Sequence, residues 1–158
     1  MDYIALARGV HVLAVVIWIG GVSMATSVAL AAVRAGELGP DKLSAFHNFE
    51  RRFVWQARTA VLLTGLSGIY MLARLHLWDR FLSIQFWWMH AMVCVWLLFA
   101  FVLFVAEPLI LHRRFERLAK SEPDRAFAWL QRVHWFLLGL SYLTIFGAVA
   151  GSHGWSII

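Results

Sequence analysis

Hydrophobic and polar positions divide the 158-residue chain into four long apolar stretches separated by short polar breaks. The stretches cover residues 3–33, 43–75, 81–112 and 125–152, and the second begins with an amphipathic lead-in before its apolar part starts at Phe53. Each stretch exceeds the roughly 20 residues that an α-helix needs to cross about 30 Å of hydrocarbon. Because the apolar runs do not alternate with a period of two, the pattern predicts helices rather than strands.

The breaks at 36–40, 78–80 and 121–124 are short and carry residues typical of turns, including glycine, proline and aspartate. Short connections make consecutive helices antiparallel neighbours. The sequence therefore predicts an all-α integral membrane protein, with one transmembrane domain over 1–158 built as an antiparallel four-helix bundle. The first stretch is too long for the apolar region of a signal peptide and has no basic leader, so we expect it to remain in the mature protein.

Composition supports a membrane protein, because 61% of the residues are hydrophobic, 15% are charged, and the mean hydropathy is +0.71. Soluble domains average about 45–50% apolar and about 25% charged residues. The expected partner of the helices is therefore the lipid bilayer. The single cysteine, Cys94, offers no disulfide framework.

Basic residues are distributed unevenly between the two ends of the predicted bundle. Three lie at the end that holds the N-terminus, and eleven lie at the opposite end, which we call the basic end: Arg34, Lys42, Arg51, Arg52, Arg58, Arg113, Arg114, Arg117, Lys120, Arg125 and Arg132. Cytoplasmic loops carry the excess of basic residues, so we expect the basic end in the cytoplasm and both termini outside it. The net charge of +5 then reflects topology and contact with anionic lipids, and no nucleic-acid partner is expected.

Three of the seven histidines lie inside the apolar stretches, where ionisable groups are costly and point to a function. His11 follows Asp2 by nine residues, and His90 follows Asp79 by eleven. Since the first and third helices start from the same end, both imidazoles should lie at similar depth, about 14–17 Å from those charges. His134 lies nearer the basic end. His47, His76 and His112 lie near the ends of the stretches, where interfacial positions are expected, and His153 lies in a Gly-Ser-His-Gly segment that is expected to face water.

Two imidazoles at one depth on two helices can hold one metal centre, and a haem iron accepts two neutral imidazoles. His11 and His90 are therefore the predicted axial ligands of a b-type haem. Arg8, one helical turn nearer the surface, is expected to meet a propionate, and Trp87 is expected to line the cofactor. His134 is a reserve ligand. The alternative is that the two histidines are unrelated and hydrogen-bond with the backbone or with hydroxyl groups.

Copper is an alternative cofactor, because Met89, His90, Met92 and Cys94 place soft ligands within six residues. Thioether and thiolate sulfurs suit Cu(I). His90 and Cys94 share one helix face, whereas the two methionines point elsewhere. Methionine in an apolar helix usually serves packing, so both interpretations stay open.

A buried ion pair is predicted between the second and third helices. Arg58 lies six residues deeper in its helix than Arg52, and Glu107 lies six residues deeper than Arg113. Each is therefore about 9 Å further along the helix axis from the basic end than that arginine. Equal depth and opposite charge predict that the two side chains neutralise each other. Pro108, next to Glu107, is expected to kink the third helix.

Small residues in the fourth helix mark a packing surface. Gly147 and Gly151 form a GxxxG pattern, which allows two helix backbones to approach closely. The pattern serves contact within one chain or between two chains, so a homodimer is left open.

The order of these features resembles known families of four-helix bacterial membrane proteins. The segments that carry the resemblance are Arg8-Gly-Val-His11, Trp18-Ile-Gly-Gly21, Glu50-Arg-Arg-Phe53 and Leu63-Thr-Gly-Leu66. The first helix is similar to that of the copper resistance protein D (CopD-like) family and of the HemJ-like protoporphyrinogen oxidases. The second helix is similar to that of the CopD-like family.

The resemblance implies a bacterial inner-membrane location and, for the HemJ-like branch, haem bound by a first-helix histidine and a third-helix lysine. His11 matches the first position, whereas His90 replaces the lysine, which favours a low-spin haem with two histidine ligands. We therefore expect a membrane cytochrome b that carries single electrons, with a quinone or a periplasmic redox protein as partner. The alternatives are a haem-dependent oxidoreductase, such as a protoporphyrinogen oxidase or a superoxide oxidase, and a copper transporter of the CopD type.

Overall fold

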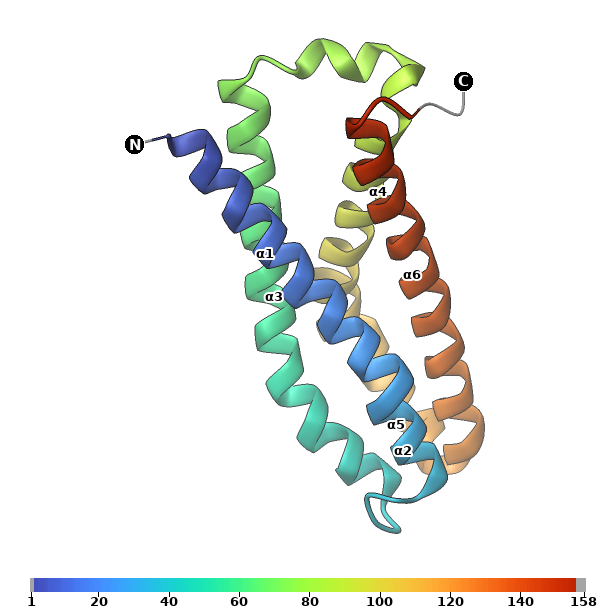
Figure 1. Ribbon diagram of the computed structural model, residues 1–158. Coiled ribbons are helices and arrows are strands. Elements are labelled where there is room, and N and C mark those ends of the chain that lie inside the picture. The colour runs from blue at the N-terminus through green and yellow to red at the C-terminus, as the bar shows by residue number, and fades with distance from the viewer. Residues whose placement is uncertain (1, 156–158) are drawn as a thin grey trace.

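The computed structural model describes residues 2–155, and these form four long helical rods joined by short connections (Figure 1). The first rod comprises α1 (Tyr3–Met24), the π-helical η1 (Ala25–Ala29) and α2 (Leu30–Ala35), and the second is α3 (Lys42–Arg74). After the 3₁₀ segment η2 (Trp78–Leu82), the third comprises η3 (Ile84–Phe86), α4 (Trp87–Phe101), the π-helical η4 (Val102–Leu111) and α5 (His112–Ser121). The fourth is α6 (Pro123–Ser152). The predicted all-α architecture of four helices is confirmed.

Three of the four rods are long and apolar enough to cross a membrane: Tyr3–Ala35, Ile84–Ser121 and Pro123–Ser152. The second rod, α3, has 33 residues, as the first rod does, but it is more polar and is not among the rods that are apolar enough to cross a membrane. Large apolar side chains nevertheless face outward from all four rods. Val16, Leu66, Leu109 and Phe136, one from each rod, are 62%, 65%, 66% and 69% exposed. Such a continuous apolar exterior is expected of a protein that has lipid as its solvent.

Local signals explain where the rods begin and end. The side chains of Asp2 and Asp41 accept hydrogen bonds from backbone N–H groups in the first turns of α1 and α3. Gly36 ends the first rod with φ +77°, a left-handed conformation that favours glycine. Pro123 occupies the first turn of α6, where its missing N–H is not needed. The third rod continues to Ser121, nine residues beyond the predicted end, so Glu122 alone links it to α6.

The rods pack as a bundle in which α1 lies along α3, and α4 and α5 lie against α6. Fewer contacts join α3 to α4 and α1 to α6, so α1 and α4 are diagonal to each other. Side chains meet across this diagonal near the middle of the bundle, where the rings of Trp18 and Phe99 pack edge to face with 4.9 Å between their centroids. A second buried cluster, around Leu30, Phe46 and Phe127, closes the basic end.

Arg58 and Glu107 form the predicted ion pair, with 2.8 Å between Arg58 Nη2 and Glu107 Oε2. Arg58 Nε also donates to the carbonyl oxygen of Leu103 at 3.1 Å. In a π-helix the N–H of each residue bonds to the carbonyl five positions earlier, and Pro108 has no N–H to offer Leu103. Arg58 therefore replaces a missing backbone donor and neutralises a carboxylate at the same time.

The glycine pattern of α6 is used within the chain. The indole rings of Trp87 and Trp88 pack directly onto the backbone at Gly147 and Gly151. This contact joins α4 to α6 by inserting large aromatic side chains into the space that glycine leaves. The GxxxG surface is thus already occupied by α4, and a homodimer stays a prediction.

We expect Gly147→Ala to lower the thermal stability of the protein in detergent. The added Cβ would lie 2.9 Å from Trp87 Cζ2, and overpacking of this kind costs about 1–3 kcal/mol, more than the helix propensity of alanine returns. The matched control is Gly139→Ala on the same helix, where nothing lies within 4 Å of the added Cβ. Equal melting temperatures for the two variants would contradict the packing argument.

Candidate functional site

His11 is held against α3 by two hydrogen-bonding groups. Its Nδ1 lies 3.0 Å from the carbonyl oxygen of Thr64 and 3.1 Å from Ser67 Oγ. A carbonyl only accepts, so this contact places a proton on Nδ1, and in a neutral ring Nε2 keeps its lone pair. The ring lies beside Gly68, where a Cβ would come within 3.4 Å of His11 Cε1. In histidines that bind metals, the second ring nitrogen commonly donates to a carbonyl in this way.

His90 has a different environment, in which both ring nitrogens face backbone carbonyls. Nε2 lies 3.0 Å from the carbonyl oxygen of Phe81, and Nδ1 lies 3.3 Å from that of Phe86. The ring also stands edge-on to the Phe81 ring at 5.3 Å. A neutral imidazole carries one N–H, so it can donate to only one of these carbonyls. His90 thus ties α4 to the 3₁₀ segment η2, and none of the described hydrogen bonds joins it to His11.

The other residues predicted to hold the haem are Arg8, Trp87 and His134. Arg8 is exposed on α1. Trp87 packs onto Gly147 of α6, and its Nε1 is buried without an acceptor among the described residues. His134, the reserve ligand, is half-buried on α6 and its Nδ1 lies 2.9 Å from the carbonyl oxygen of Leu130, one turn earlier.

The soft ligands around His90 do not face one way. Met89 is buried, whereas Met92 and Cys94 are exposed. A copper site needs several of these sulfurs on one side of the helix. The structure therefore gives the copper interpretation no convergent set of donors in this segment.

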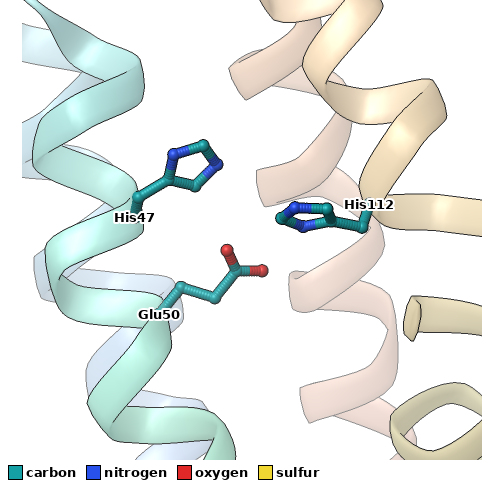
Figure 2. A group of neighbouring side chains, drawn as sticks. All are labelled: His47, Glu50 and His112. Carbon is teal, nitrogen blue, oxygen red and sulfur yellow. The ribbon is translucent and has the colours of Figure 1, made fainter.

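A second group of polar side chains converges near the basic end of the bundle. Figure 2 shows His47 and Glu50 on α3 pointing toward His112, which begins α5 on the facing rod. One potential ligand atom from each residue lies within 4.8 Å of the other two. The centroids of the His47 and His112 rings are 5.7 Å apart, with 32° between the ring planes.

Glu116 completes this group, which we call the His–Glu cluster: His47, Glu50, His112 and Glu116. Glu116 Oε1 lies 3.7 Å from His47 Nε2 and 3.6 Å from His112 Nε2, too far for a hydrogen bond in either case. His47 Nε2 is buried and has no hydrogen-bond partner among the described residues. A buried polar atom without a partner is unusual and calls for an explanation.

Negative charge accumulates around Glu50, which precedes the apolar part of α3. Burial, together with the carboxylates of Glu107 and Glu116 and against the opposing effect of His112, raises the pKa of the Glu50 carboxyl to about 7. The arrangement holds more potential acceptors than donors. A cation bound among these side chains would offset the cost of burying an ionised carboxylate and would reduce the repulsion between the carboxylates.

The sequence predicts separate interfacial positions for His47 and His112, includes Glu50 only in a segment that carries the family resemblance, and gives Glu116 no predicted role. The available signal was the spacing His-x-x-Glu on α3 and His-x-x-x-Glu on α5, since residues three or four apart share a helix face. Both patterns lie at the basic end, next to the arginines that mark it.

Comparison of the chain with models of known protein families, with curated proteins and with solved structures gave no match. The functional argument therefore rests on the geometry of these side chains.

Proposed function

We propose that this chain is a b-type cytochrome of the bacterial inner membrane, with one haem between α1 and α4 and His11 and His90 as its axial ligands. The observation that supports it best is the environment of His11, whose Nδ1 is held by Thr64 and Ser67 so that Nε2 is left as a lone-pair donor. Haem bound by two imidazoles supplies one-electron transfer rather than oxygen activation. Electron partners of this chemistry are a membrane quinone or a periplasmic redox protein.

The second ligand, His90, fits after a small local change. Its Nε2 would exchange the carbonyl of Phe81 for the metal, which gives up one hydrogen bond worth about 0.5–1.5 kcal/mol. That carbonyl belongs to η2, a short 3₁₀ connection with no buried residues.

The proposal is tested by the optical spectrum of the full chain, expressed in cells supplied with a haem precursor and purified in mild detergent. We expect a Soret band, and on reduction the sharp α and β bands of a six-coordinate low-spin haem. Protein that is folded but colourless, and that takes up no haem on addition of hemin, would exclude the assignment. Reduction of the haem by a candidate substrate would instead point to a haem-dependent oxidoreductase.

We further propose that all four rods span the membrane, with both termini in the periplasm. Both ends of the described chain lie at the same end of the bundle (Figure 1). By their positions in the sequence, eleven of the fourteen basic residues belong toward the opposite end, which is the distribution expected of a cytoplasmic face. The α3 rod, at about 50 Å, is long enough to cross despite its polar lead-in.

A phosphatase reporter that folds only in the periplasm tests this topology. We expect it to be active when fused after Ile158, a position outside the described residues, and inactive when inserted at Gly39 in the connection at the basic end. The insertion control must show fluorescence when a cytoplasmic reporter replaces the phosphatase. Phosphatase activity at Gly39 with none at Ile158 would invert the orientation.

A further inference from the structure

We propose that the His–Glu cluster is a second metal centre, separate from the proposed haem, and that it binds one divalent transition-metal cation of the Zn²⁺ type. The ligands are His47 and His112 through their Nε2 atoms, together with the carboxylates of Glu50 and Glu116. The site lies between α3 and α5 at the basic end of the bundle, whereas His11 and His90 lie in the half that holds the termini.

The spacing of the side chains fits a common cation. Two ligand atoms on one tetrahedral zinc ion lie about 3.3 Å apart, given zinc–ligand bonds of about 2.0–2.1 Å. Glu116 Oε1 is 3.6 and 3.7 Å from the two Nε2 atoms, within a few tenths of an ångström of that separation. The ligand atoms of His47, Glu50 and His112 lie within 4.8 Å of one another. Rotation of the imidazoles and of the glutamate carboxylates about their side-chain torsions would supply the remaining closure.

The unpartnered nitrogen of His47 is the independent observation. Its Nε2 is buried, receives no hydrogen bond within the described part of the chain, and faces the oxygen of Glu116 at a distance too long for one. A metal ion placed among the four side chains would satisfy this atom. Metal centres in helical bundles are built in this way, from histidine and glutamate side chains that face one another across neighbouring helices.

The donor set selects the kind of cation. Two imidazole nitrogens with carboxylate oxygens suit Zn²⁺, Fe²⁺, Mn²⁺ or Co²⁺, whereas Ca²⁺ and Mg²⁺ prefer oxygen alone and Cu(I) prefers sulfur. The side chains of His47, Glu116 and His112 keep 34%, 32% and 42% of their surface exposed. An ion can therefore reach them from the water at the basic end.

A simpler explanation is an ion pair between one protonated histidine and Glu116, without a metal. That pair would leave the second imidazole facing the same oxygen without a role, and it would give no selectivity for transition metals. The two explanations differ in what a titration with metal alone would show.

The test uses the full chain in detergent, stripped with a chelator and titrated with Zn²⁺ by calorimetry. We expect one ion per chain with a dissociation constant in the micromolar range or tighter. Co²⁺ should give the visible bands of four- or five-coordinate cobalt. His47→Gln and His112→Gln should each weaken Zn²⁺ binding at least tenfold, and the double variant should abolish it. His153→Gln, an exposed histidine near the C-terminus, is the matched control and should bind normally.

Glu50→Gln, which preserves volume, provides a further variant where a histidine substitution prevents folding. Zinc binding should be unchanged in His11→Ala, and haem content should be unchanged in His47→Gln, so that failure of either centre can be told from failure of the other. Binding of less than 0.2 ion per chain would overturn the proposal. So would binding that persists in the folded double variant.

Discussion

The variant Glu107→Ala should lose about 3 kcal/mol of stability, because it leaves the Arg58 guanidinium without its counter-ion inside the bundle. Breaking a buried pair costs about 3–5 kcal/mol, and the lower end applies here because the two side chains keep 25% and 22% of their surface exposed. The remaining charge cannot move far, since Arg58 Nε is also bound to the carbonyl of Leu103. Reversible unfolding in mixed detergent, followed by helical circular dichroism, measures the loss.

A double-mutant cycle isolates the contact. The cycle compares Arg58→Ala and Glu107→Ala with the double variant that carries both, and the double variant should recover much of the loss, although the carbonyl of Leu103 then lacks a donor. The control is Glu122→Ala, which removes an ion pair with Arg125 on the surface between α5 and α6 and should cost less than about 0.5 kcal/mol. Strictly additive losses for Arg58 and Glu107 would show that the two charges do not interact.

This pair also shows why part of the structure could be read from the sequence. The rise of a helix is fixed, so counting residues from charges at the membrane surface gives depth, and Arg58 and Glu107 meet as that count predicts. The same count cannot give the direction of a side chain or the local helix type. The π-helical turn around Pro108, and the role of Arg58 in capping Leu103, depend on contacts between rods that sequence spacing does not specify.

The histidines illustrate the same limit. Counting residues predicts that His11 and His90 lie at one depth, but it does not predict the partners of His11, since Thr64 lies 53 residues away in the sequence. The His–Glu cluster was missed for the same reason, because His47 and His112 come together only when α3 packs beside the third rod. Spacing along one helix shows which polar residues share a face, but it does not show which face of another helix they meet.

Replacing His11 by alanine should abolish haem binding, because the variant removes an imidazole whose Nδ1 is held by the carbonyl oxygen of Thr64 and by Ser67 Oγ on the neighbouring helix, which leaves the Nε2 lone pair for the iron. His90→Ala should have the same effect, and Ser67→Ala should weaken haem retention and shift the reduction potential without removing the ligand, since it loosens only the support of His11.

The measurement is haem per folded chain, from the pyridine haemochrome spectrum and the protein concentration, after passage through a size-exclusion column. His153→Ala, an exposed histidine near the C-terminus, is the control and should keep a full complement of haem. The variant His134→Ala tests whether His90 or His134 is the second haem ligand. If it loses the haem while His90→Ala retains it with an unchanged spectrum, the iron lies deeper, between α1 and α6, and His90 serves only to hold η2 against α4. Retention of the full spectrum in folded His11→Ala would remove the basis of the cytochrome assignment.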